Sequence, residues 1–525
     1  MKKFLYLLIW ALPVISNYAC SDDTLEEIPS KESGSGIVTD SLYESYLGPW
    51  ILSGRSIEDS TVRLKYNVTI SEKVKGLTYN IYGWGSTKFG LSHPLEAQVQ
   101  NDGSFTIKMG KVIGKYQDEK TRKEFSISPV WCSHKGSILF FENGITIQGQ
   151  LRGNRILFKG TPPTGGLTYT VEAHGMMNMS EKSEMIIQHP TLQKIPKSAP
   201  YYSHNELISL QKSTREKSIN ITIFGDGYTE DYDFGENGRF ITDAREAMES
   251  FFSIEPYTTF RDYFNVMAVA TYSPERGCSN TGSGLKVNNT FCTAFEDILN
   301  GSMINCNHNQ LLKKYKRYDF KKNNRYDIII LLANSDFYGG TAYMFFTNTM
   351  PNIAIVPVCR RNNAFGDILK HEAGGHAFGL LADEYVYENY RYIPDNEKKV
   401  KQRSMVEYDY GKNITFDYRT NELWNMFQAM ASYPFVNYYE GALTYGRGVW
   451  RSERNSCMRN MYGRFSTVSR EYIYRKIHEA TGREYRLEDF IEYDKKNLDD
   501  YAVESRTAPN EDLPEPLKDC VFFMK

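Results

Sequence analysis

The spacing of apolar residues changes near residue 217, and this change constrains the fold more than any other feature of the sequence. From about residue 38 to residue 175, apolar side chains recur at every second position, as in the run from Thr61 to Ile70. Glycine-rich turns such as Asn101-Asp102-Gly103 separate these runs. Because successive side chains point to opposite faces of a strand, this pattern predicts an antiparallel β-domain, a sandwich or a small barrel, over residues 38–175.

After residue 217, helical spacing alternates with short apolar runs. Apolar residues at positions 240, 244, 247, 248 and 251 share one helical face, and Ile328–Leu332 is typical of a strand buried on both faces. Strands that alternate with helices predict an α/β domain with a partly parallel sheet over residues 217–525. The polar segment 176–216 between the two domains is rich in proline and is predicted to be a linker that partly packs on the next domain.

Length and charge bound the function classes. A chain of 525 residues is expected to fold as more than one domain. It has 62 Lys and Arg against 64 Asp and Glu, which gives a formal net charge of -2. A dedicated nucleic-acid-binding protein normally has an excess of basic residues, so we expect no nucleic-acid partner.

The N-terminus has the features of an export signal. Lys2 and Lys3 precede a short apolar stretch, which ends at Asn17-Tyr18-Ala19-Cys20. A small residue before a lone cysteine resembles a bacterial lipobox. We therefore expect a signal peptide over 1–19, a lipid on Cys20 that anchors the chain to the outer membrane or cell surface of a Gram-negative bacterium, and a flexible tether over 20–37. The alternative is an ordinary signal peptide and a soluble secreted product.

Seven further cysteines follow Cys20. Export permits disulfide bonds. Cys278, Cys292 and Cys306 lie in one loop-like stretch, and a bridge among them is the best expectation, although the sequence does not give the connectivity.

The segment that points to chemistry is His371-Glu372-Ala373-Gly374-Gly375-His376. Zinc helices usually carry their histidines at i and i+4, whereas these lie at i and i+5, about 140° apart on a regular α-helix. An undistorted helix could not direct both imidazoles at one ion. A π-bulge would realign them, and we expect Gly374-Gly375 to permit it because glycine tolerates unusual backbone angles.

A catalytic zinc site needs a third protein ligand. Gly379 lies where the chain could leave the helix, and Asp383 or Glu384 could then turn back towards the metal. Glu372 would lie beside a zinc-bound water, whose pKa the metal lowers to about 7. We expect this carboxylate to act as general base, and the reaction class that fits is peptide-bond hydrolysis.

The run H-E-A-G-G-H-A-F-G-L-L-A-D-E-Y resembles the active-site helix of the IgA-specific metallopeptidase family. The segments 224–229 and 456–459 resemble further elements of that family, and the resemblance covers about 217–485. It implies a metzincin-like fold with a methionine turn at Met458, or alternatively Met461. The metzincin pattern would place the third ligand at Ala382; we assign it to Asp383, with Glu384 as the alternative.

Weaker candidates surround this core. Tyr385 and Tyr462 could stabilise an oxyanion. Tyr338-Gly339-Gly340-Thr341-Ala342-Tyr343 resembles an edge where peptidases hold a substrate backbone by strand addition.

These features predict a surface-tethered zinc metalloendopeptidase that acts on extracellular proteins. Its Zn2+ would be held by His371, His376 and Asp383, and its partner would be a protein or peptide substrate. An alternative is an inactive lipoprotein adhesin or glycan- or protein-binding module; another is hydrolysis of amides in peptidoglycan peptides. The sequence gives neither the substrate nor the oligomeric state.

Overall fold

The computed structural model describes residues 40–498 and 521–523, except for 57–60, 62, 85–92, 118–123, 136–137, 143, 161–164, 174–175, 180–186, 297–301, 321, 324, 348, 361–363 and 462. The predicted signal peptide, the tether, Cys20 and Tyr462 lie outside these residues. Within them, no helix has both the length and the apolar character required to cross a membrane.

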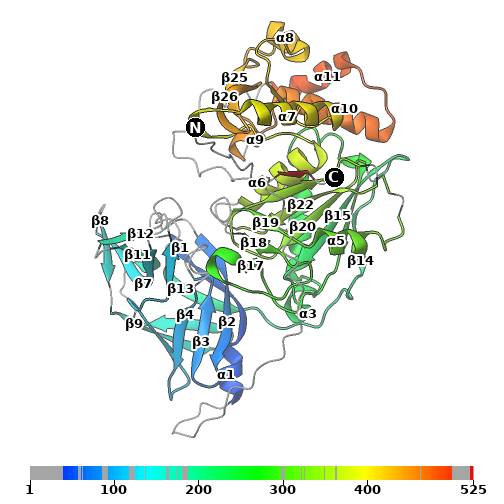
Figure 1. Cartoon of the computed structure of the whole chain (residues 1–525). Helices are drawn as coiled ribbons and strands as arrows, with labels where there is room; N and C mark the ends of the chain where they lie inside the picture. Colours follow the sequence, from blue (N-terminus) through cyan, green and yellow to red (C-terminus); the bar gives the residue numbers. More distant parts are fainter. Residues whose placement is uncertain are drawn as a thin grey trace, which may run out of the picture. The chain divides into compact units, whose positions relative to one another are not determined.

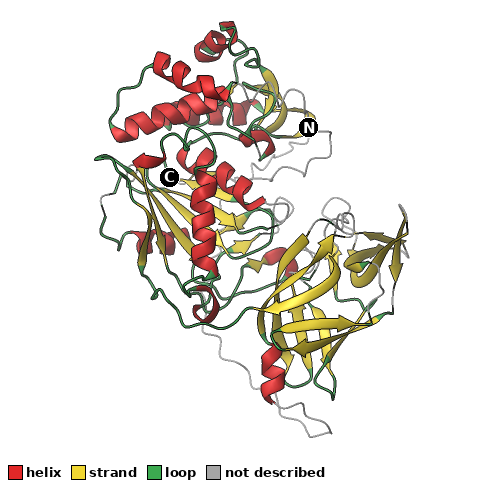
Figure 2. Ribbon diagram, turned by 180° about the vertical axis from the view of Figure 1, so that it is seen from behind, coloured by secondary structure: helices red, strands yellow, loops and turns green. Residues whose placement is uncertain are grey.

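The N-terminal domain consists almost entirely of strands, with the short helix α1 (Asp40–Tyr46) (Figure 2). Neighbouring strands are antiparallel, and β1 pairs with both β2 and β13, so the sheet closes into a barrel. The strands of this ring are β1 (Gly48–Ser56), β2 (Arg63–Val74), β3 (Thr78–Tyr82), β4 (Leu95–Val99), β5 (Phe105–Lys108), β9 (Thr146–Arg152), β10 (Arg155–Lys159) and β13 (Ile187–Lys194).

The same sheet continues beyond the ring. The additional strands are β11 (Gly166–Ala173), β7 (Glu124–Lys135), β6 (Gly114–Gln117), β8 (Ile138–Glu142) and β12 (Met176–Met179). Alternate ring residues such as Trp50, Ile81 and Leu192 fill a closed apolar core. The expected antiparallel β-domain is confirmed, and of the two predicted forms the structure has the barrel.

The segment 176–216, predicted to be a linker, contains two long-range strands. β13 pairs with β1 and β10 of the barrel, and β14 (Leu207–Gln211) pairs with β16 of the next domain. Alternation in β13 is hidden by His189, whose φ is 48°, and by Pro190. Its pairing depends on partners far away in the sequence, which local spacing does not reveal.

The second domain is built on a seven-stranded mixed sheet (Figure 1). Its order is β14, β16 (Phe264–Val269), β15 (Ile219–Asp226), β20 (Ile328–Ala333), β22 (Asn352–Pro357), β21 (Thr341–Met344) and β27 (Val521–Phe523). The four strands from β16 to β22 are parallel, while β14 and β21 run antiparallel to their inner neighbours. The predicted α/β domain is therefore confirmed.

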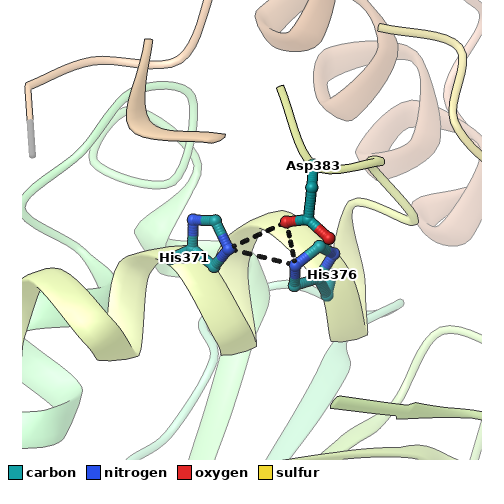
Figure 3. A group of neighbouring side chains, drawn as sticks. All are labelled: His371, His376 and Asp383. Atoms are coloured by element: carbon teal, nitrogen blue, oxygen red, sulfur yellow. Dashed lines mark hydrogen bonds and ion pairs between the residues drawn. The ribbon is translucent and has the colours of Figure 1, made fainter. Parts of the chain in front are cut away.

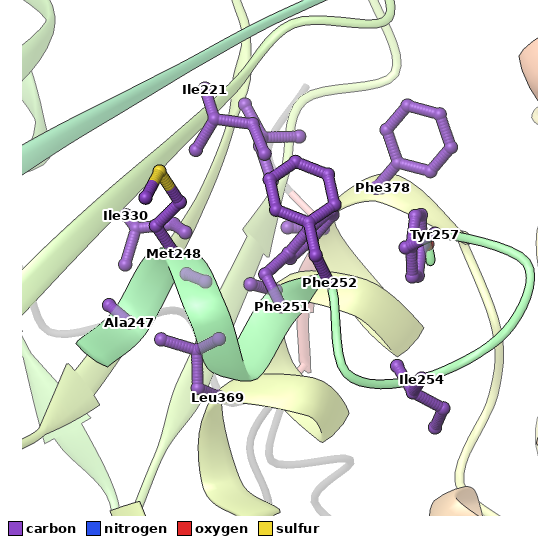
Figure 4. Close-up of a cluster of buried hydrophobic side chains, with 14 of the residues drawn as sticks. Ile221, Ala247, Met248, Phe251, Phe252, Ile254, Tyr257, Ile330, Leu369 and Phe378 are labelled. Atoms are coloured by element: carbon purple, nitrogen blue, oxygen red, sulfur yellow. The ribbon is translucent and has the colours of Figure 1, made fainter. Parts of the chain in front are cut away.

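Helices pack on this sheet through the predicted apolar face. Ala247, Met248 and Phe251 of α4 (Arg239–Phe251) lie in one core with Ile221 and Ile330 from the sheet (Figure 4). The same core contains Leu369 and Phe378, which begin and end the segment that carries the histidine motif (Figure 4). This packing fixes that segment against the centre of the domain.

Further elements complete the domain. They are α3 (Glu230–Asp233), η2 (Arg261–Tyr263), β17 (Ser279–Asn280), η3 (Thr281–Ser283), β18 (Ala294–Phe295), β19 (Ile304–Asn305), α5 (His308–Tyr315), α6 (Ala364–Leu369), η6 (Lys370–Phe378), β23 (Val386–Tyr392), α7 (Asp395–Glu407), β24 (Ile414–Thr415), α8 (Glu422–Ala429), β25 (Tyr439–Ala442), β26 (Thr444–Arg451), α9 (Cys457–Asn460), α10 (Thr467–Thr481), α11 (Leu487–Asp494) and η7 (Lys495–Asn497).

The prediction of a disulfide among Cys278, Cys292 and Cys306 is wrong. Cys278 and Cys306 are both free thiols, so no bridge can form within this set of three. The Cys278 Sγ lies instead 3.1 Å from Thr293 Oγ1. Spacing in the sequence could not distinguish a bridge from thiols packed separately.

Candidate metal centre

Helix α6 continues without a break into η6, which is a π-helix. In a π-helix the backbone hydrogen bonds join residues five apart, so side chains at i and i+5 point in similar directions. His371 and His376 occupy such positions, and their Nε2 atoms are 3.1 Å apart. The predicted π-type distortion is thereby confirmed, and it extends over two turns rather than one bulge.

The structure gives a different reason for the two glycines in this helix from the one expected. Neither Gly374 nor Gly375 has a positive φ. A Cβ on Gly375 would lie 2.2 Å from Met458 Sδ, and one on Gly374 would lie 3.1 Å from a ring carbon of Tyr257. The glycines are therefore required for close approach of neighbouring side chains, not for unusual backbone angles.

The chain leaves the helix and turns back at Leu380, whose φ is 53°. Gly379, the residue expected to release the chain, keeps a helical backbone. The turn brings Asp383 Oδ1 to 3.2 Å from His371 Nε2 and 3.0 Å from His376 Nε2 (Figure 3). Ala382, by contrast, packs in an apolar cluster away from the two imidazoles.

These three ligand atoms form a triangle that fits a metal ion. Their separations are 3.0, 3.1 and 3.2 Å. Ligand atoms about 2.0–2.2 Å from a tetrahedral zinc lie roughly 3.3–3.5 Å apart, so small outward shifts would accommodate the ion. When the histidine, cysteine and acidic residues that the structure describes are compared, these three form the group whose ligand atoms all lie within 4.8 Å of one another.

The second nitrogen of each imidazole is held by the backbone. His371 Nδ1 lies 3.1 Å from the carbonyl oxygen of Cys457, and His376 Nδ1 lies 2.8 Å from that of Leu381. A carbonyl oxygen only accepts, so in the neutral imidazoles each Nδ1–H donates and each Nε2 lone pair faces the centre. Such outer contacts fix the tautomer that binds a metal.

The centre is electrostatically suited to a cation. Both histidines are fully buried and Asp383 is 8% exposed. Burial alone would raise the pKa of the Asp383 carboxyl, but His376 and His371, when protonated, attract the carboxylate and donate hydrogen bonds to it, and so hold this pKa below its usual range. The carboxylate is therefore charged and available as a ligand.

Glu384, the alternative third ligand, does not join the cluster. Its carboxylate accepts hydrogen bonds from Asn413 Nδ2 at 2.8 Å and from Ser456 Oγ at 2.5 Å. Its backbone N–H donates to the carbonyl oxygen of Met458. Burial raises the pKa of Glu384 to about 7. Glu384 thus ties the loop that carries Asp383 to the segment that carries Met458.

The turn that carries the two methionine candidates lies beside the helix. Met458 is buried and its sulfur approaches Gly375, while Met461 ends α9 in a left-handed conformation. Ser456 and Asn413 were not among the predicted site residues. Ser456 lies in the Cys-Met segment that the sequence singled out. Asn413 could not be found from the sequence, because folding alone brings it to the Glu384 carboxylate.

Glu372 is buried next to the two histidines. A Cβ on Gly340, the residue that precedes β21, would lie 2.5 Å from Glu372 Oε1, so the backbone there touches the carboxylate. Tyr385 is also buried, and its ring stacks on Tyr387 with centroids 5.3 Å apart. Glu372 therefore lies in the same buried helix as the two histidines, with its carboxylate against the backbone of Gly340.

His371, His376 and Asp383 thus form a buried cluster in the α/β domain that could hold a metal ion. Residues 208–402 match the model of the family described as IgA Peptidase M64. This match covers less than half of the chain and supports, for that region, the resemblance to the IgA-specific metallopeptidase family that the sequence indicated. No curated protein matches the chain.

Proposed function

We propose that this chain is a zinc metalloendopeptidase that hydrolyses peptide bonds of extracellular proteins. The observation that carries the proposal is the convergence of His371, His376 and Asp383, two of them in the buried helix that also carries Glu372. Two imidazoles and one carboxylate are a ligand set typical of catalytic zinc, which keeps a further position open. A zinc ion held there would supply Lewis-acid chemistry, by polarising the substrate carbonyl and activating water.

Glu372 is the general base of the proposed reaction. Its carboxylate accepts the proton of the attacking water and passes it to the amine that leaves. Positioned acid–base catalysis of this kind contributes about 10²–10⁴ in rate. Its contact with Gly340 supports this role, because it places the carboxylate at the start of strand β21, where an extended substrate could lie.

Neighbouring residues would support the site. Tyr385 or Tyr462 would donate a hydrogen bond to the developing oxyanion. Met458 would form a methionine turn below the metal, and the antiparallel position of β21 next to parallel strands is consistent with a metzincin-like arrangement. Asp383, rather than Glu384, is the proposed third ligand.

The proposed location is the bacterial cell surface. The apolar N-terminal stretch and the lipobox-like segment before Cys20 support export, lipidation of that cysteine and anchoring in the outer membrane. A tethered peptidase would meet protein substrates outside the cell.

Metal content tests the site first. Plasma mass spectrometry of purified residues 21–525 should find about one zinc per chain, as expected for one site with three protein ligands. The variant His371→Ala should lose the metal, while His204→Ala, a change at an exposed histidine, should retain it. If no stoichiometric metal binds after zinc supplementation, the peptidase proposal is wrong.

Hydrolysis tests the reaction. The zinc-loaded protein should cleave an unfolded protein such as reduced casein, and Glu372→Gln should lower kcat by at least about 10²-fold with zinc content unchanged. Equal rates for the two proteins would remove Glu372 from the mechanism and favour the alternative of an inactive binding module.

A further inference from the structure

Strand β21 packs near the helix that carries His371 and His376. The π-helix η6 contacts both β21 and β22. Gly340 directly precedes β21 and touches the carboxylate of Glu372. A backbone that pairs with β21 therefore runs past the residue proposed as general base.

A strand at the edge of a sheet has unpaired N–H and C=O groups that can bind an extended peptide. On its inner side β21 pairs with β22 through Thr341, Ala342 and Tyr343. On its outer side β21 pairs with β27, the last strand in the order. Without β27, the outer side of β21 would be the edge of the sheet. This outer side is the place where a peptide could add to the sheet next to the site.

The chain itself already occupies that place. β27, at the red end of the colour scale in Figure 1, runs parallel to β21. Val521 pairs with Ala342, Phe522 with Tyr343 and Phe523 with Met344. Neighbouring strands lie about 4.8 Å apart, so no second peptide can use the same edge while β27 is paired.

We propose that residues Val521–Phe523 are an internal occupant of the substrate edge and compete with peptide substrates for β21. The inference rests on the proposed peptidase function insofar as the competing ligand is a substrate. The recognised chemistry is the backbone of an extended peptide, and Val-Phe-Phe is composed of residues with high strand preference.

The occupant is held weakly enough to be displaced. Among the described residues, three pairs join β27 to β21. Each hydrogen bond contributes about 0.5–1.5 kcal/mol net, so this pairing alone is modest. Covalent connection raises the effective concentration of β27 to about the millimolar range, which lets it compete without tight intrinsic binding. Competition of this kind raises KM for peptides and leaves kcat unchanged.

Peptide binding tests the inference separately from hydrolysis. The protein carries Glu372→Gln so that no cleavage occurs, and the probe is fluorescein-labelled Asp-Ser-Val-Phe-Phe-Met-Lys, which reproduces 519–525 with Cys520→Ser. In one variant Val521→Gly, Phe522→Pro and Phe523→Gly prevent pairing, because proline cannot donate to a sheet. In the matched control Val521→Ile, Phe522→Tyr and Phe523→Tyr preserve strand preference.

The disrupted variant is expected to bind the probe at least tenfold more tightly in fluorescence polarisation than the parent and the control do. A probe with Phe522→Pro, which cannot donate the same backbone hydrogen bond, should show no such difference. Equal affinity of all three proteins for the probe would overturn the inference, whether or not the zinc-loaded parent cleaves casein. Absence of cleavage with a tenfold gain in binding would instead contradict the proposed function alone.

A reversible cross-link covers the case in which the disrupted variant fails to fold. Ala342→Cys and Val521→Cys place two thiols on directly paired residues, at a separation that a disulfide can span. Oxidation should weaken probe binding at least tenfold, and reduction should restore it. If the cross-link does not form, or forms without weakening binding, β27 does not occupy the edge and the inference is wrong.

Discussion

Asp383 and Glu384 show how neighbouring carboxylates acquire different roles. Asp383 Oδ1 lies about equally far from the two imidazoles, at 3.2 and 3.0 Å. Glu384 points away and is bound by Asn413 and Ser456. Since successive residues of an extended segment face opposite sides, one loop can supply both a metal ligand and its anchor.

This difference predicts the order of zinc affinities. Asp383→Asn removes the charged ligand atom and should lower zinc affinity by more than about 100-fold, whereas Glu384→Gln disturbs only a supporting contact and should lower it by about 10-fold. Competition with a chromogenic chelator measures both. A larger loss for Glu384→Gln than for Asp383→Asn would make Glu384 the ligand.

Lys476 predicts a pH effect on stability. It is buried, its ammonium lies 5.6 Å from the Phe378 ring, and burial lowers its pKa to about 7 from 10.5. Between about pH 7 and 10.5 the unfolded chain holds a proton that the folded chain lacks, so this group makes stability rise with pH across that window.

Lys476→Met removes this proton and keeps the apolar stem. It should stabilise the domain at pH 7 by roughly 1–3 kcal/mol, and the gain should vanish above about pH 10.5. Urea unfolding at pH 7 and pH 10.5 measures it, with the exposed Lys399→Met as control. A gain that is equal at both pH values would show that the ammonium is not desolvated.

At the scale of elements, the sequence predicted the distortion of the histidine helix because the information for it is local. The i, i+5 spacing of His371 and His376 predicted a π-type distortion, and the structure has a π-helix there. The reason for Gly375 could not be predicted, since Met458 reaches it from a distant segment. The pairing of β13 and β27 is equally long-range.

The π-helix makes a sharp prediction about deletion of Gly375. The deletion converts the motif to His-Glu-Ala-Gly-His, in which an ordinary α-helix brings the two imidazoles to one face. Because a π-helical turn differs from an α-helical one by a single residue, the flanking contacts should be preserved. The deletion variant is therefore expected to retain about one zinc per chain.

Gly375→Ala is the matched comparison. Its Cβ would collide with Met458, and this overpacking should cost about 1–3 kcal/mol of stability. Adding Met458→Ala should remove the collision. Thermal unfolding and zinc content distinguish the variants. Loss of zinc on deletion, with the alanine variant unaffected, would show that the ion depends on the wider π-helical turn itself.

At the scale of the whole molecule, the apolar residues of the barrel and those of the α/β domain form separate hydrophobic cores. The core of the barrel is drawn from residues 43–192, while the cores around the mixed sheet are drawn from residues 208–490. Each set is closed by its own sheet. We therefore expect the barrel and the α/β domain to unfold in two separate transitions, because the residues of each core pack among themselves.

Metal binding should identify these transitions. A ligand that binds only the folded state stabilises it by about 4 kcal/mol at 1,000 times its Kd, so zinc should raise only the midpoint of the domain that contains His371, His376 and Asp383. Calorimetry with and without a chelator should show that midpoint falling by roughly 5–15 °C while the other stays fixed. In His371→Ala the chelator should move neither midpoint. If zinc raised both midpoints equally in the parent, the two cores would unfold as one unit, and the barrel would be part of the stability of the metal centre instead of an independent module.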